Sequence, residues 1–340
     1  MFAYIVKRLI AGLVVLVLVS LSVFMLFFYG PKSPARTVCD FKTSQKCTDA
    51  KEATFERDLG FDDKSFIGGA MTQYGYYMKG IAVGRDFEIG GLPYRCEAPC
   101  FGLSYRTSEQ VWPEMVDRLP ATISVAVGGA FLYLIIGVPM GVAAARRRGT
   151  VQDKALVSSF LILSSVPYYL FALLTFLYTV VWFEVPVIGN PGYTPFSENP
   201  YEWFTGLALA WICLGIFGCT QYTRYARGAM VEALGEDYVR TAKAKGLPTR
   251  TVVYKHGLRA ALVPIVTIFG IDFGTLLAGT IFTEKIFDIN GIGLWALNAI
   301  GDQDLPIVAA TALFSAAVLI VANLLVDILY SILDPRVRLA

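Results

Sequence analysis

The sequence predicts an all-α polytopic membrane protein with six transmembrane helices, and three observations support this. Of the 340 residues, 55% are hydrophobic and only 16% are charged, which is too little polar surface for a soluble globular protein. Six stretches are long and apolar enough to cross about 30 Å of hydrocarbon as helices of ~20 residues. These stretches lack the period-two alternation of barrel strands, so their backbone amides must be satisfied within helices.

The first predicted span has the features of a secretory signal only in part. Lys7 and Arg8 precede it, but its apolar run is about twice the usual ~7 to 15 residues and no A-x-A site follows. We therefore expect it to remain in the protein.

The fifth span is interrupted only by Asp272. The predicted spans cover residues 9–29, 119–145, 155–182, 204–222, 260–282 and 305–326.

Basic residues are distributed unevenly over the segments that join these spans. The two termini and the loops 146–154 and 223–263 hold sixteen Lys and Arg residues, whereas the short loops 183–203 and 283–304 hold only Lys285. An excess of Lys and Arg is typical of short cytoplasmic loops. Both termini are therefore expected in the cytoplasm.

This pattern divides the chain into three parts. Residues 1–29 are an N-terminal tail and the first span, and residues 30–118 form a long extracytoplasmic segment. Residues 119–340 form a five-helix core that includes the cytoplasmic loop 223–263. The segment 30–118 faces outward because it follows the first span from a cytoplasmic N-terminus.

Four of the six cysteines fall in the outward segment, where oxidising surroundings allow disulfides. Pairing of Cys39 with Cys47 and of Cys96 with Cys100 is one of three connectivities, and we prefer it because each bond closes a small local loop. A zinc site is the alternative, although the segment holds no His to serve as a ligand. The other two cysteines lie in the fourth span and are expected to be packing residues.

The long cytoplasmic loop predicts a short helix. Glu236 and Asp237 place negative charge at its start, good helix formers follow, and Gly246 is suited to be its C-cap. Pro248 then turns the chain into a second amphipathic segment, 250–259. The exposed helix could dock on a cytoplasmic partner or lie against anionic head groups, and residue spacing alone leaves both readings open.

Several ordered motifs resemble the dipeptide and oligopeptide branch of binding-protein-dependent ABC transporter permeases. The loop sequence GEDYVRTAKAKGL, with the delayed Pro264, is that branch's version of the family loop; only Ala242, Gly246 and Leu258 agree with the general pattern. The further matching segments are Arg118-Leu119-Pro120-Ala121-Thr122, Arg146-Arg147-Arg148-Gly149, Glu284-x-x-Phe287, Gly291-Ile292-Gly293, Asn323-Leu324-Leu325-Val326-Asp327 and Tyr330-x-x-x-Asp334-Pro335-Arg336-Val337-Arg338.

The outward segment departs from the family. Arg57-Asp58-Leu59-Gly60-Phe61 and Gly102-Leu103-Ser104 resemble it, but four cysteines and an aromatic, Gly-rich stretch are added between the first and second spans. These additions leave the choice of substrate open.

The resemblance implies a type I ABC importer permease of the bacterial plasma membrane. Two such subunits, a pair of related but different chains, would form a pore for di- or oligopeptides. Two ATPase subunits would bind beneath it, and an extracytoplasmic solute-binding protein would deliver the cargo. The chain is then not an enzyme and binds no cofactor itself, since ATP and Mg belong to the ATPase subunits. The residues agree that the ATPase is a separate chain, because no G-x-x-x-x-G-K-[ST] loop occurs.

The resemblance also implies that the helix 236–245 is the coupling helix, which sits in a groove of the ATPase. Its polar side chains would contact the ATPase, and its C-terminal glycine would set the backbone geometry. The expected coupling residues are Glu236, Asp237, Tyr238, Arg240, Ala242, Lys243, Lys245 and Gly246.

Polar and small residues within the spans yield further expectations. Asp272 is the only acidic residue near the middle of a span, where an ionisable group costs ~2.5 to 3.5 kcal/mol. It could line the translocation path and meet the amine of a peptide, or form a hydrogen bond between helices. Asp327 could pair with a basic residue such as Arg224 or Arg227. Close helix packing is expected at Gly137/Gly141, Gly215/Gly218 and Gly270/Gly274.

Other classes of function have less support in the sequence. A secondary transporter would show inverted repeats and more charges within the spans, and a membrane anchor would leave the loop helix unexplained. An intramembrane enzyme lacks a catalytic constellation, because the single His256 lies in a loop and neither H-E-x-x-H nor G-x-S-x-G occurs. Nucleic-acid binding is not indicated, because the basic residues follow membrane orientation. A non-peptide solute such as a metal chelate is the alternative cargo.

Overall fold

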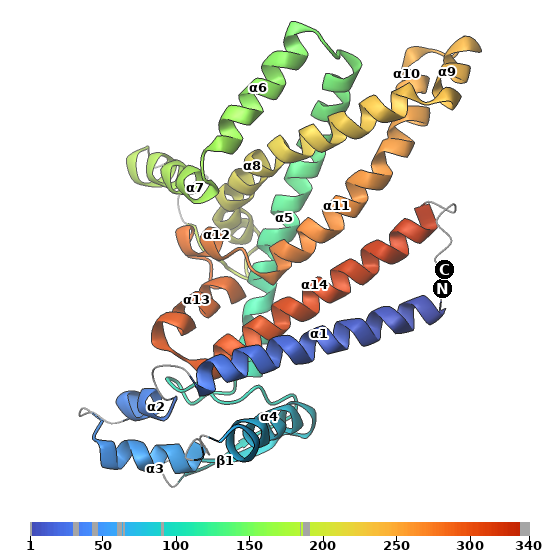
Figure 1. Cartoon of the computed structure of the whole chain (residues 1–340). Helices are drawn as coiled ribbons and strands as arrows, with labels where there is room; N and C mark the ends of the chain where they lie inside the picture. Colours follow the sequence, from blue (N-terminus) through green and yellow to red (C-terminus); the bar gives the residue numbers. More distant parts are fainter. Residues whose placement is uncertain are drawn as a thin grey trace. The chain divides into compact units, whose positions relative to one another are not determined.

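The computed structural model describes residues 2–29, 34–42, 47–59, 63, 65–89, 92–183, 185 and 191–333 (Figure 1). Within these residues the regular structure is helical apart from one hairpin, in which β1 (Arg85–Ile89) pairs antiparallel with β2 (Leu92–Cys96). The predicted all-α membrane fold is therefore confirmed. The C-terminal motif 334–338 and residues 60–61 lie outside the described residues.

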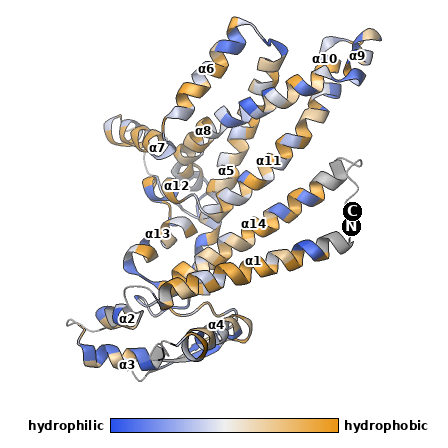
Figure 2. Cartoon of the chain, in the orientation of Figure 1, coloured by the Kyte–Doolittle hydropathy of each residue, from blue (hydrophilic) through white to orange (hydrophobic). Residues whose placement is uncertain are grey.

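Five helices of the described chain are long and apolar enough to cross a membrane, and each overlaps one predicted span. Figure 2 shows hydrophobic residues along most of α1, α11 and α14. Two of the five, α5 and α8, have 36 residues each, well beyond the ~20 that a bilayer requires. The five are α1 (Phe2–Phe28), α5 (Val111–Arg146), α8 (Pro200–Gly235), α11 (Leu258–Ala278) and α14 (Leu305–Leu333), with α10 (Thr249–Thr251) and η3 (Val252–Gly257) leading into α11.

The third predicted span is not one straight helix. It consists of α6 (Val151–Ser165), α7 (Tyr168–Phe176) and η2 (Leu177–Trp182), with a bend of 87° between α6 and the other two. Val166 stands at the break in an extended conformation, with φ −82° and ψ 130°. Proline disfavours helical geometry in the residue before it. Pro167 therefore accounts for the break, which hydropathy alone did not reveal.

The described chain forms two compact units. The first, which we call the core unit, comprises residues 121–290 and 319–333. The second, the N-terminal unit, comprises residues 2–120 and 291–318. The core unit includes two further short helices, α9 (Asp237–Ala244) and α12 (Ile281–Ile286).

Close helix packing in the core unit depends on glycine. A Cβ atom on Gly141 of α5 would lie 2.6 Å from the carbonyl oxygen of Thr223 on α8, and one on Gly215 of α8 would lie 2.7 Å from Leu132 Cβ. A Cβ atom on Gly274 of α11 would lie 2.6 Å from the Cβ of Ala322 on α14. Any larger residue would push these helices apart. The predicted role of the three glycine pairs is confirmed.

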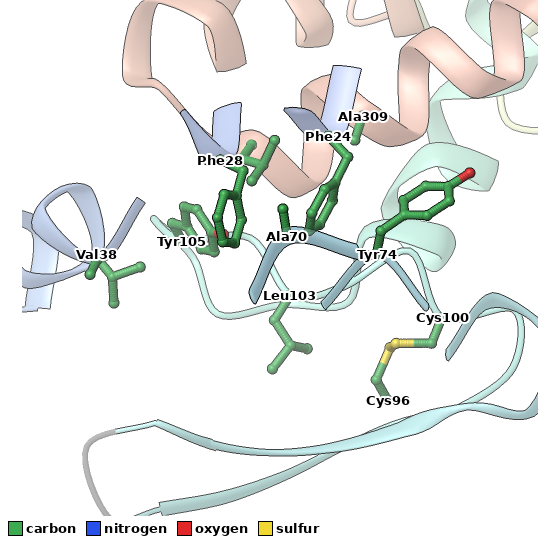
Figure 3. Packing of buried hydrophobic residues seen from close by; sticks show 12 residues of the cluster. Phe24, Phe28, Val38, Ala70, Tyr74, Cys96, Cys100, Leu103, Tyr105 and Ala309 are labelled. Atoms are coloured by element: carbon green, nitrogen blue, oxygen red, sulfur yellow. A yellow bond between two sulfur atoms is a disulfide. The ribbon is translucent and has the colours of Figure 1, made fainter. Parts of the chain in front are cut away.

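The N-terminal unit packs short helices and the hairpin against the end of α1. Phe24 and Phe28 of α1 lie beside Ala70 and Tyr74, as Figure 3 shows, with Leu103 in the same cluster. Disulfides join Cys39 to Cys47 and Cys96 to Cys100, the connectivity preferred from the sequence. The further helices of this unit are α2 (Pro34–Lys42), α3 (Asp49–Leu59), η1 (Phe66–Met71), α4 (Thr72–Val83) and α13 (Ile292–Asp302).

Candidate functional site

The loop helix predicted from the sequence is α9, one residue shorter at each end than expected. Glu236 is its N-cap and Lys245 its C-cap. Gly246 follows with φ +76°, in the left-handed region that favours glycine. Its amide donates to the carbonyl of Lys243 at 2.9 Å, and the amide of the next residue donates to the carbonyl of Ala242 at 3.4 Å. This pair of bonds is the Schellman motif, which ends a helix sharply.

One face of α9 is packed tightly against its neighbours. Val239 and Ala242 are buried together with Val252 of η3, and Leu234 at the end of α8 packs on the same cluster. Apolar contacts thereby fix α9 to the end of α8 and to η3, which leads into α11. Ala242 serves as a packing residue within this cluster, so its place in the family loop has a structural reason.

The other face of α9 is exposed and polar. Asp237 and Arg240 form a 3.4 Å ion pair, but both side chains are largely exposed, so the pair itself contributes little stability. Tyr238 is also exposed, although partial burial raises the pKa of its hydroxyl. The six polar residues predicted to contact a partner are all exposed in this structure: Glu236, Asp237, Tyr238, Arg240, Lys243 and Lys245.

A groove of about 780 Å³ runs beside α9. Glu232, Glu236 and Tyr238 line it from the end of α8 and the start of α9. Lys255 and Arg259 line it from η3 and α11. The groove therefore carries both signs of charge, and together with the exposed face of α9 it offers a rigid surface to a partner protein.

Asp272 lies where the sequence placed it, in the apolar part of α11. Its carboxylate accepts a 2.9 Å hydrogen bond from the hydroxyl of Tyr222 on α8. The ring of Tyr222 in turn stacks on Tyr133 of α5, with centroids 4.5 Å apart. The same three residues line a cavity of about 230 Å³ together with Gln221. Asp272 therefore joins two helices and borders a largely apolar cavity, an arrangement that fits both of its predicted roles.

Arg227, one of the basic residues named as a possible partner of Asp327, pairs with a different residue. Arg227 of α8 does not serve as the partner of Asp327; its guanidinium instead binds Asp153 of α6 through two bonds of 2.6 and 2.7 Å. Asp153 is buried and also accepts from the amide of Gly149 at 3.0 Å. Sequence reasoning missed this pair. The pattern Thr150-x-x-Asp153 indicates only a helix start, so it did not identify Arg227 as the partner of Asp153.

The motif Glu284-x-x-Phe287 is buried at a contact between helices of the core unit. Glu284 is fully buried in α12 and accepts a 2.9 Å hydrogen bond from Thr122 Oγ1 of α5. Phe287 is also fully buried and contacts Phe176 of α7 edge-on. The motif thus ties α12 to two other helices, a contact between distant segments that the sequence did not reveal.

Comparison with known proteins places this arrangement in a family. The family described as "Binding-protein-dependent transport system inner membrane component" matches residues 137–339, which include α9 and Asp272. A second family, described as "Binding-prot-dependent transport system membrane comp, N-term", matches residues 1–126. The chain belongs to the first of these families. As an inner membrane component it is a permease subunit of the bacterial inner membrane, which supersedes the secondary-transporter and membrane-anchor alternatives.

Two relatives of this inner membrane component are similar over their whole length. The dipeptide transport system permease protein DppB of Escherichia coli K12 is 32% identical over 359 aligned residues, with 99% of each chain covered. The protein named probable peptide ABC transporter permease y4tP of Sinorhizobium fredii is 30% identical, with 99% of this chain and 100% of the relative covered. The resemblance noted in the sequence is therefore confirmed, and the family implies a binding protein and an ATPase as partners in general.

Proposed function

We propose that this inner membrane component is one of two permease subunits in an ATP-driven importer of di- or oligopeptides. Its relatives that align end to end are named for dipeptide or peptide transport, which supports a peptide as the cargo. The second subunit of the pore is a related but different chain. A solute-binding protein outside the membrane delivers the peptide.

The proposed orientation places both termini and α9 in the cytoplasm. The uneven distribution of Lys and Arg supports it, because the loop around α9 carries eight of these residues and the loop 283–304 carries one. Residues 30–118, with their two disulfides, then face the oxidising exterior.

The observation that supports the mechanism most directly is the construction of α9. The helix is capped at Gly246, packed on one face against α8 and η3, and exposed on its polar face. A rigid body of this kind transmits displacement rather than absorbing it. When the nucleotide-bound ATPase dimer closes, it moves α9 and, through the apolar contacts, the helices α8 and α11.

The energy for transport enters from the partner subunits. ATP and Mg bind to the two ATPase subunits, and this permease subunit contributes the surface on which the ATPase subunits act. Its expected contact residues are the exposed polar side chains of α9.

Purification of the tagged chain from its native membrane tests this proposal. We expect a second permease, an ATPase and a solute-binding protein to copurify, and labelled dipeptide to accumulate in vesicles that hold the complex and internal ATP. A photoreactive amino acid in place of Tyr238 should form an adduct with the ATPase. Phe196, an exposed aromatic residue in the loop 191–199, is the matched control and should form none. Recovery of the chain alone would contradict the proposal, and an ATPase adduct at Phe196 but not at Tyr238 would reverse the orientation.

A further inference from the structure

The segment formed by η1 and α4, Phe66–Val83, is apolar on both faces. Lys79 is its only charged residue over 18 positions. A helix that is apolar all round is ordinarily covered on every side. Among the described residues of the N-terminal unit, the cluster that contains Phe24 and Phe28 of α1 covers one face of this segment (Figure 3), whereas the residues of another face are exposed.

The uncovered face is mainly apolar, with Thr72 and Lys79 as its exposed polar residues. Ile67 is 80% exposed and Val83 is 67% exposed, and between them the exposed residues recur at helical spacing. The large apolar side chains on this face are Phe66, Ile67, Met71, Tyr76 and Val83. We call these five residues the outer stripe.

The contacts of Tyr74 show at which level of the membrane this segment lies. Its hydroxyl is 2.6 Å from Ser20 Oγ and donates to the carbonyl oxygen of Val17 at 3.2 Å. Both partners belong to the apolar span Val6–Leu26 of α1. At a rise of 1.5 Å per residue, Ser20 lies about 9 Å inside the end of that span. The ring of Tyr74 also contacts Phe24, with centroids 5.6 Å apart.

We propose that η1 and α4 form an interfacial helix whose outer stripe is inserted among the acyl chains of the membrane. Interfacial helices bury their apolar face ~5 to 10 Å into the boundary between head groups and acyl chains, which matches the level of Ser20. The face of α1 turned away from Tyr74 is also apolar and exposed, at Leu18 and Leu26, as expected of a span that presents its surface to lipid. Lys79 has a stem long enough to carry its ammonium group to the phosphates.

This assignment changes the interpretation of the segment 30–118, which the sequence presented as wholly outside the membrane. Part of it would be anchored in lipid, in the outer leaflet if the proposed orientation holds. Together with the cluster around Tyr74, this anchor fixes the hairpin and the Cys96–Cys100 disulfide close to the membrane surface.

Photolabelling of the assembled complex tests the inference. The complex is reconstituted in vesicles of phosphatidylethanolamine and phosphatidylglycerol that contain a phospholipid with a diazirine in its acyl chain, present in both leaflets. After irradiation, peptides from Phe66–Val83 and from α1 should carry lipid adducts. Peptides from α3, which is polar and has exposed residues such as Lys51, should carry none. Labelling of α1 without labelling of Phe66–Val83 would overturn the proposal.

A second arm distinguishes lipid from a protein partner. A photoreactive amino acid replaces Ile67 in one variant and Lys51 in another. We expect a phospholipid adduct at position 67 and not at position 51. An adduct between position 67 and another polypeptide would overturn the proposal and assign the outer stripe to a subunit interface. Neither arm depends on ATP or on peptide uptake, so the result is independent of the proposed transport function.

Discussion

The hydroxyl of Tyr222 donates a hydrogen bond to the carboxylate of Asp272, and this bond joins α8 to α11 within their apolar segments. We expect Asp272→Asn to keep both assembly and peptide uptake, because the amide oxygen can still accept from Tyr222. Tyr222→Phe removes the donor and should lower stability by about 0.6 kcal/mol and by no more than about 1.7 kcal/mol, the mean and the maximum found for hydrogen bonds between membrane helices. Thermal unfolding of the purified complex and uptake of labelled dipeptide measure the two effects. Lost uptake in Asp272→Asn with unchanged unfolding would instead place Asp272 on the translocation path.

Gly246 provides the sharpest test of the coupling helix. Its φ of +76° penalises any side chain, while a Cβ atom there would meet nothing within 4 Å, so Gly246→Ala introduces backbone strain without a clash. The strain should be about 1 kcal/mol and should reorient α9. We expect an assembled complex in which ATP-driven uptake is lost, measured in vesicles with internal ATP.

Two other glycines supply the controls for that variant. Gly149 also has a positive φ, of +85°, and Gly228 lies within α8; a Cβ atom on either would meet nothing within 4 Å. Gly149→Ala introduces similar strain in a different loop, and Gly228→Ala introduces none. Both should retain uptake. If Gly149→Ala loses uptake as Gly246→Ala does, strain in general is responsible and α9 has no special role.

The ion pair between Asp153 and Arg227 should stabilise the contact between α6 and α8. Asp153→Ala removes two hydrogen bonds from Arg227 and one from the amide of Gly149, so we expect a loss of at least about 1.5 to 3 kcal/mol. Arg224→Ala, an exposed residue one turn earlier on α8, is the matched control and should change stability much less. A double-mutant cycle with Arg227→Ala, followed by thermal unfolding, isolates the pair. Additive losses in the cycle would show that the two side chains are not coupled.

The disulfide pairing predicts how many cysteines react with an alkylating reagent before and after reduction. Four of the six are joined as Cys39–Cys47 and Cys96–Cys100, and Cys213 and Cys219 are free and buried. Alkylation of the unfolded, unreduced protein should therefore modify two cysteines, and reduction should raise the number to six. Peptide mapping by mass spectrometry identifies which residues react. Zinc released on unfolding, with six thiols already reactive before reduction, would favour the metal site instead.

Local signals in the sequence were sufficient to predict much of the candidate site. The helix at α9 followed from the charges of Glu236 and Asp237 and from Gly246, because capping acts over a few residues and is visible as a short pattern. The close approaches at Gly137/Gly141 and the other pairs followed from small residues spaced by one helical turn. The preferred disulfides followed from cysteines that are near neighbours along the chain.

Contacts between segments far apart in the sequence could not be predicted from short local patterns. The partner of Arg227 had several candidates of the right charge, and only the packing of α6 on α8 selected Asp153. The burial of Glu284 depends on Thr122, which is 162 positions away. Pro167 is a local signal for the bend between α6 and α7. The long apolar run 155–182 nevertheless led to the prediction of a single span.

The sequence by itself determined that this chain crosses a membrane, which side each loop is expected to face, and where a capped helix stands between the fourth and fifth spans. Hydropathy, charge and capping are properties of neighbouring residues, so their effects appear in linear order. Only the tertiary structure decided which polar groups pair inside the spans and at what depth Tyr74 meets α1. Those outcomes depend on the mutual approach of helices, which many side-chain combinations permit and only one packed arrangement selects.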